Sequence, residues 1–153
     1  MSILLSQLVD RAAEKLSDRV AFSDPSTGIT FGELAMESSQ LAHLLVDEGV
    51  ERGDRVGILL PRCAETAVAV YGVLKAGAAF VPIDPLMPAQ RVREIIENCG
   101  IRHLITSEKQ RKALVNLVAS PGRLECVIGY VMEGSELRFH SWGDWQGAPG
   151  MKT

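Results

Sequence analysis

The stretch that decides the fold is Thr66–Pro85, TAVAVYGVLKAGAAFVPIDP. A nearly all-apolar run reaches Gly77, and a second, shorter apolar run covers residues 78–83. This order predicts a helix, a tight turn and a buried strand, because glycine suits the left-handed position just past a helix end. The helix is apolar on more than one face, so we expect it between a sheet and a neighbouring helix. We expect the strand at the centre of a layered α/β domain.

Short apolar runs recur at an even interval beyond this stretch. They begin near Val56, Ala79, Arg102 and Glu125, and each start follows the previous one by 23 residues. That interval holds one strand, one crossover helix and two loops, as a right-handed parallel βαβ series requires. The spacing therefore predicts an α/β fold with a mostly parallel, doubly wound sheet and flanking helices.

The N-terminal part has a different pattern. An apolar stripe predicts an amphipathic helix packed against the domain, formed by Leu4, Leu5, Leu8, Ala12 and Leu16. Turn-forming residues 23–28 then separate two short strands and predict a hairpin. Thr30 and Glu33 have the spacing of a capping box, which predicts a helix start followed by a helix that ends at Gly49.

The later helices carry their own boundary signals. Pro88 and Gly100 predict the two ends of one helix, and Ser107 with Gln110 predicts a capping box for the next. After Ile128 the order weakens, and the turn at residues 133–135 predicts a hairpin that joins Cys126–Met132 to Leu137–His140. We therefore expect an α/β domain over 1–132 and a terminal hairpin or loop over 133–153.

Composition excludes several classes of function. The chain of 153 residues is 46% hydrophobic and carries a formal net charge of −3. This net charge is negative, whereas proteins that bind nucleic acid or an anionic membrane carry a positively charged surface. The N-terminus has no apolar run long enough for a signal peptide or a membrane span, so we expect a cytoplasmic protein. Cys63, Cys99 and Cys126 are expected to be reduced thiols, with metal or nucleophile roles left open.

The carboxyl ends of the predicted strands are the first places to look for chemistry, since open α/β sheets bind ligands there. Arg62 precedes a helix N-terminus and could assist an anion, but the turn lacks the glycines of a phosphate loop. Asp84 could accept a phosphoryl group, although no carboxylate pair for Mg²⁺ accompanies it, and a turn residue is the better interpretation. Thr106-Ser107 is explained by the predicted helix cap.

The histidines and tryptophans yield no complete site. His43, His103 and His140 have no Cys, Asp or Glu at metal-ligand spacing in a suitable loop. Trp142 and Trp145 could frame a ligand, but aromatic residues in a terminal loop are more often packed against the domain or a missing segment. The sequence therefore predicts no catalytic, cofactor-binding or metal-binding residue in this chain.

Three motifs, in order, resemble one superfamily. ITFGEL at Ile29–Leu34, GVERGDRVGILLPRCAETAVAVYGVLKAG at Gly49–Gly77 and LKAGAAFVPIDP at Leu74–Pro85 are similar to the adenylate-forming, AMP-forming ligases. That superfamily includes acyl-CoA synthetases, aryl-acid ligases, luciferases and the adenylation domains of peptide synthetases. The resemblance covers about Leu4 to Val118 and implies the first part of the N-terminal domain of such a ligase.

The resemblance also implies a reaction. A carboxylic acid attacks ATP to give an acyl adenylate, and a thiol or amine then takes the acyl group. ATP and Mg²⁺ are implied for the full-length parent and no cofactor for this chain, because the family's phosphate loop and catalytic lysine come later than Thr153. Lys75 matches a motif position that has no catalytic role in the family.

Two hypotheses follow from the sequence. The leading one is an N-terminal ligase fragment that is inactive alone, has the remainder of the ligase chain as its partner and forms a homodimer through uncovered surfaces. The alternative is a stand-alone, non-catalytic α/β binding or regulatory module. A third interpretation, a receiver-like phosphoacceptor using Asp84, is the weakest. The coding sequence downstream of Thr153 distinguishes the first two.

Overall fold

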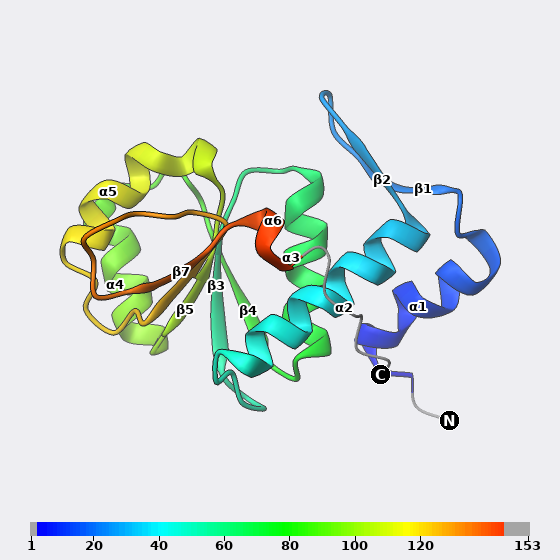
Figure 1. The fold of residues 1–153 in the computed structure, drawn as a ribbon, viewed down its shortest axis with the longest axis horizontal. Helices are drawn as coiled ribbons and strands as arrows, with labels where there is room; N and C mark the ends of the chain where they lie inside the picture. Colours follow the sequence, from blue (N-terminus) through cyan, green and yellow to red (C-terminus); the bar gives the residue numbers. More distant parts are fainter. Residues whose placement is uncertain (1–2, 146–153) are drawn as a thin grey trace.

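A computed structural model describes residues 3–145 as an α/β fold with a parallel sheet and an N-terminal hairpin (Figure 1). The helices are α1 (Leu5–Leu16), α2 (Phe31–Asp47), α3 (Ala64–Lys75), α4 (Ala89–Cys99), α5 (Arg111–Ala119), preceded by a 3₁₀ turn (Glu108–Gln110), and α6 (Trp142–Trp145). The strands are β1 (Val20–Ser23), β2 (Gly28–Thr30), β3 (Arg55–Leu59), β4 (Ala79–Ile83), β5 (His103–Ile105), β6 (Cys126–Ile128) and β7 (Arg138–His140).

The predicted parallel sheet is confirmed. Its order within the described residues is β4-β3-β5-β6-β7, and every neighbouring pair is parallel. The strands at the 23-residue interval begin at Arg55, Ala79, His103 and Cys126, close to the predicted starts. Because the chain moves from β3 to β4 on one side and then to β5 on the other, the order reverses between β3 and β5. That reversal is where doubly wound sheets bind ligands.

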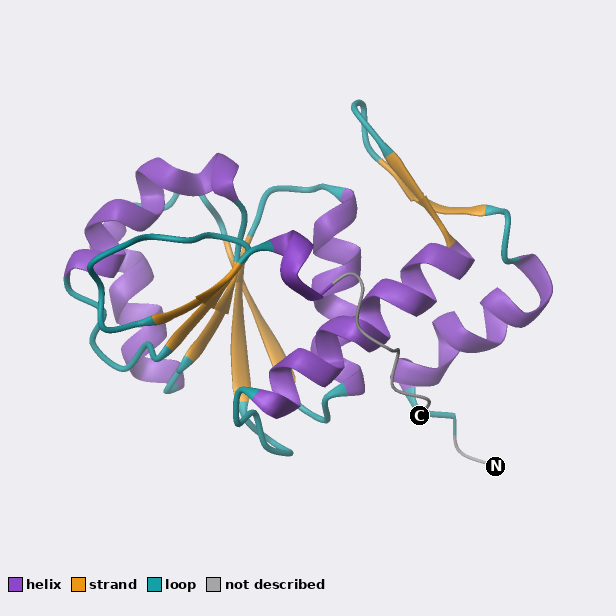
Figure 2. Ribbon diagram, in the orientation of Figure 1, coloured by secondary structure: helices purple, strands orange, loops and turns teal. Residues whose placement is uncertain are grey.

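Helices cover both faces of the sheet (Figure 2). On one face, side chains of α2 and α3 such as Leu41 and Val68 pack with Val56 of β3 and Ile105 of β5. On the other face, α4 and α5 pack their own apolar residues against Leu104 and neighbouring strand residues. The two buried clusters make this a three-layer arrangement.

Helix α3 lies between the sheet and α2, as its apolar faces predict. The predicted end is also confirmed, because Gly77 has a φ of 81° in the left-handed region. Lys75, the last residue of this helix, has a side chain that is 0% exposed. Its Nζ donates to Asp10 Oδ1 of α1 at 2.7 Å and to Ser39 Oγ of α2 at 2.8 Å. The lysine therefore ties three helices together.

The expectation that strand 78–83 is central is wrong. Within the described residues β4 is an edge strand of the sheet, and its Phe80 is 39% exposed. The signal against a central position is Pro82, which has no backbone N–H to donate to a second neighbouring strand. The apolar residues of this strand are therefore only partly covered within residues 3–145.

The expectation for the first helix is wrong in its orientation. α1 packs on α2, but Val9 is its buried residue, whereas Leu4 and Leu5 are 62% and 65% exposed. The Asp10–Lys75 ion pair fixes this rotation, because it requires Asp10 to face the domain. Most of the predicted stripe consequently faces outward, where Leu8 and Leu16 are also exposed.

The predicted hairpin β1–β2 and the capping box of α2 are both confirmed. Thr30 Oγ1 accepts from the Glu33 backbone N–H, and the Glu33 carboxylate accepts from the Thr30 N–H. Pro88 is the N-cap of α4 and Gly100 its left-handed end, as predicted. The capping box of Ser107 is wrong, because its side chain makes no cap hydrogen bond and a 3₁₀ turn precedes α5.

The predicted terminal hairpin is also wrong. β7 runs parallel to β6, with Cys126 opposite Arg138 and Ile128 opposite His140. The loop after β6 turns at Gly129, whose φ is 97°. It then returns to the end of the sheet at which β6 begins, and β7 starts there. Residues 142–145 form the short helix α6, and residues 146–153 of the predicted loop lie outside the described residues. Among residues 3–145, no helix is both long and apolar enough to cross a membrane.

Candidate functional site

The ligand position at the carboxyl ends of β3 and β5 is filled by the chain itself. Thr106 follows β5 and its Oγ1 donates to the Leu59 carbonyl of β3 at 2.9 Å. Trp142 of α6 donates from Nε1 to the Thr106 carbonyl, also at 2.9 Å. The side chain of Thr106, which was expected to belong to a helix cap, thus bridges β3 and β5. The indole of Trp142 covers the carboxyl ends of these two strands.

The N-terminus of α3, where a bound anion would lie, is likewise occupied by a side chain of the protein itself. Asp24 reaches from the β1–β2 hairpin and its Oδ2 accepts from the Ala64 backbone N–H at 3.1 Å. Hydrogen bonds from the side chain and backbone of Ser26 lower the pKa of Asp24 to about 2, with Ala64 and Thr27 adding to the effect. A carboxylate that is charged at neutral pH therefore occupies the place that a bound anion would need. Arg62, the residue suggested to assist, is exposed.

A cavity of about 300 Å³ lies beside this helix start and is acidic. Glu33, Glu37 and Glu65 line it together with Ala64 and Trp142. Burial, reinforced by the charges of Glu33 and Glu65, raises the pKa of Glu37. Three carboxyl groups and Asp24 make this region unfavourable for a polyphosphate, so the described residues at this edge do not fit ATP.

Asp84 is a turn residue in the structure. Its Oδ1 accepts from the Leu86 backbone N–H at 2.9 Å, and its carbonyl accepts from the Met87 N–H. The residue is exposed and follows the edge strand β4. This arrangement agrees with the structural interpretation of the aspartate.

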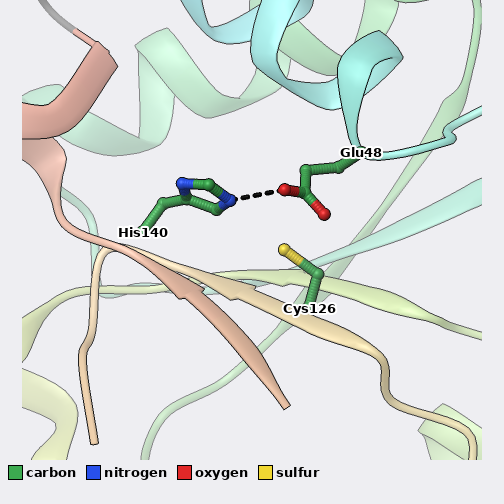
Figure 3. Close-up of side chains that lie close together, drawn as sticks. All are labelled: Glu48, Cys126 and His140. Carbon is green, nitrogen blue, oxygen red and sulfur yellow. Dashed lines mark hydrogen bonds and ion pairs between the residues drawn. The ribbon is translucent and has the colours of Figure 1, made fainter.

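A second group of chemistry-bearing side chains meets on the α2 side of the sheet (Figure 3). Glu48 follows the last residue of α2, Cys126 starts β6 and His140 ends β7. Glu48 Oε1 lies 2.6 Å from His140 Nε2, and Arg138 Nε donates to Glu48 Oε2 at 2.6 Å. One carboxylate oxygen, the thiol sulfur and one imidazole nitrogen all lie within 4.8 Å of one another.

The electrostatics of this group follow from its burial. Cys126 is 0% exposed, and desolvation raises the pKa of its thiol to about 12. Burial also opposes the charged form of Glu48, yet hydrogen bonds from Arg138 and His140 hold its pKa below the ordinary value. The same Glu48 contact raises the pKa of Arg138. The cluster therefore holds a charged carboxylate, its guanidinium partner and a neutral thiol.

Sequence reasoning missed this cluster because the residues are far apart in the chain. His140 is separated from Glu48 by 92 positions, and the sheet brings them together. One signal was available, since the alternation of a strand places Arg138 and His140 on one face. No feature of the sequence predicted that Glu48, at the end of α2, lies above that face.

The other histidines, the second tryptophan and the cysteines make contacts within the fold and form no further site among the described residues. His103 is buried with Nε2 2.9 Å from the Glu48 carbonyl, and His43 Nε2 lies 3.4 Å from Asp47 in the next turn of α2. Trp145 is 3% exposed and belongs to the core, which agrees with the expected packing of tryptophan against the domain. Cys63, Cys99 and Cys126 are free thiols.

The sequence profile of the family described as "AMP-binding enzyme" matches residues 9–148. The chain belongs to the AMP-binding enzyme family. This confirms the resemblance to adenylate-forming ligases and the assignment of the fold to the N-terminal domain of such enzymes.

Relatives within the AMP-binding family are much longer than this chain. Surfactin synthase subunit 1 of Bacillus subtilis (strain 168) is 43% identical over 102 residues, which are 67% of this chain and 3% of that protein. Coronafacic acid ligase from Pectobacterium brasiliense superposes with a TM-score of 0.86 at 23% identity, over 99% of this chain and 31% of that chain. The anthranilate CoA ligase AuaEII, solved with anthranoyl-AMP, superposes with a TM-score of 0.81 at 24% identity. The match covers 97% of this chain and 28% of that chain.

Proposed function

We propose that this chain is the N-terminal part of an AMP-forming acid ligase of the acyl-CoA synthetase kind. The whole protein would adenylate a carboxylic acid with ATP and transfer the acyl group to a thiol. The observation that carries the proposal is the family match over 9–148. Structural likeness to two ligases, one solved with an acyl adenylate, supports it. Free cysteines agree with the reducing conditions of a cytoplasmic location.

We also propose that the 153-residue chain is inactive alone. The β1–β2 hairpin places the Asp24 carboxylate on the α3 N-terminus, and glutamates of α2 and α3 line the adjacent cavity. ATP and Mg²⁺ would therefore be bound by residues outside this chain, and Thr106, Trp142 and the neighbouring core would serve as the scaffold beneath them.

The isolated chain is expected to give no acid-dependent exchange of pyrophosphate into ATP. The assay would use a panel of aryl, fatty and amino acids, with a full-length AMP-forming ligase as the positive control. The same chain extended with the coding sequence downstream of Thr153 is expected to exchange. Exchange by the 153 residues alone, or tight Mg²⁺-dependent ATP binding by them, would contradict the proposal.

The partner that we propose is the remainder of the ligase chain, and in its absence a second copy of this one. Two surfaces support this proposal: the exposed leucines of α1, including Leu5 and Leu8, and strand β4, which pairs on one side only within the described residues. Apolar surface and an open strand edge both favour association.

The isolated chain is therefore expected to dimerise, and the double variant Leu5→Glu/Leu8→Glu to weaken that dimer at least about 10-fold, because each charge would be buried in an apolar contact. Light scattering after gel filtration over a concentration series measures the change. Val115→Glu on α5, which is also exposed, is the matched control and should leave the dimer intact. A wild-type chain that stays monomeric at all concentrations would refute the homodimer.

A further inference from the structure

The cluster of Glu48, Cys126 and His140 has no part in the function proposed above. It lies on the face of the sheet covered by α2, where Cys126 is the first residue of β6 and His140 the last residue of β7 (Figure 3). The three side chains point toward one another and offer one oxygen, one sulfur and one nitrogen atom. This mixed donor set is the kind that Zn²⁺ takes, whereas Mg²⁺ and Ca²⁺ prefer oxygen alone.

We propose that Glu48 Oε1, Cys126 Sγ and His140 Nε2 bind one Zn²⁺ ion. On binding, the ion displaces the proton of the Cys126 thiol, which passes to water, and His140 binds through Nε2 as a neutral imidazole that carries its proton on Nδ1. A water molecule from solvent completes a tetrahedral site, since three protein ligands leave one position open.

The distances require a small rearrangement. Ligand atoms of a tetrahedral zinc site lie about 3.3 to 3.8 Å apart, as follows from bond lengths of about 2.0 to 2.3 Å. The three atoms here lie within 4.8 Å of one another, while Oε1 and Nε2 are in direct hydrogen-bond contact at 2.6 Å. Side-chain rotations of Glu48 and His140 would open that contact and bring both atoms toward the sulfur.

The surrounding charges are compatible with a divalent cation. The thiolate and the carboxylate would supply two negative charges, and Arg138 stays on Glu48 Oε2, where it fixes the orientation of the carboxylate as an outer partner. Glu125 adds a further carboxylate, with Oε2 3.9 Å from Arg138 Nη2. His103 binds the Glu48 main-chain carbonyl and supports the helix end that carries the ligand.

The site is accessible from one side. Cys126 is fully buried, but the side chain of His140 is 26% exposed and that of Glu48 is 14% exposed. An ion can therefore enter along His140 and reach the sulfur last.

The test is a titration of the chain with Co²⁺, which replaces Zn²⁺ and gives a sulfur-to-metal charge-transfer absorption when a thiolate is bound. The wild-type chain is expected to develop this absorption, and Zn²⁺ is expected to abolish it, whereas Mg²⁺ is not. Cys126→Ala should remove the absorption. Cys63→Ala and Cys99→Ala, which change the other free thiols, should retain it.

A second pair of variants keeps the test decisive if Cys126→Ala fails to fold. His140→Gln is expected to weaken Co²⁺ binding at least about 10-fold. His43→Gln, on the exposed side of α2, is expected to leave the affinity unchanged. The proposal is overturned if the wild-type chain shows no charge-transfer absorption, if Cys126→Ala keeps it, or if His140→Gln and His43→Gln behave alike.

Discussion

Replacing Gly129 with alanine is expected to destabilise the chain by at least about 4 kcal/mol, or to prevent folding. The residue has a φ of 97°, which costs a side chain about 1 to 2 kcal/mol in itself. A Cβ there would also overlap the Thr106 carbonyl oxygen and lie 2.6 Å from Trp142 Nε1. Those two atoms form the hydrogen bond between Trp142 and Thr106 at the carboxyl edge of the sheet, so neither can move without weakening that bond.

Gly134→Ala is the matched control for this prediction. Gly134 has a comparable φ of 77°, but nothing lies within 4 Å of a Cβ built there. Its cost should be the backbone term alone, about 1 to 2 kcal/mol. Urea unfolding followed by tryptophan fluorescence measures both variants, with Trp142 and Trp145 as reporters. Equal losses in the two variants would show that the close approach at Thr106 contributes nothing.

The ion pair between Lys75 and Asp10 is expected to respond unequally to the loss of either partner. Asp10→Ala leaves the Lys75 ammonium buried, with the Ser39 hydroxyl and the Ala35 carbonyl as neutral partners, and should cost about 3 kcal/mol. Lys75→Met should cost only about 1 kcal/mol, because the Asp10 side chain is 33% exposed and water can solvate it. The reason is the difference in exposure between the two ends of the pair.

The exposed contact between His43 and Asp47 in α2 provides the reference for these losses. Asp47→Ala removes the partner of His43, where both side chains are well exposed, and should change stability by no more than about 0.5 kcal/mol. Free energies of unfolding from denaturant titrations compare all three variants. If Lys75→Met proved as costly as Asp10→Ala, the burial of the ammonium group would not be the deciding factor.

Helices α1 to α5, the predicted ends of α2, α3 and α4 and the parallel strands β3 to β6 could be predicted from the sequence because their causes are local. Thr30 and Glu33 cap α2 within one turn, and Gly77 and Gly100 adopt the left-handed conformation that ends a helix. The interval of 23 residues between strand starts reflects the length of a βαβ unit, which the chain itself sets. Family membership follows from the same motifs.

What the sequence determined by itself was therefore most of the elements and the spacing between them, but not α6 or the 3₁₀ turn before α5. The tertiary structure alone decided the order of the strands, the face that α1 buries and the meeting of Glu48 with Cys126 and His140. These features depend on which distant segments pair, and pairing is chosen by the free energy of the whole packed core. A residue's neighbours in sequence carry little of that information, so the cluster went unseen, although Pro82 is a local sign that β4 lies at an edge.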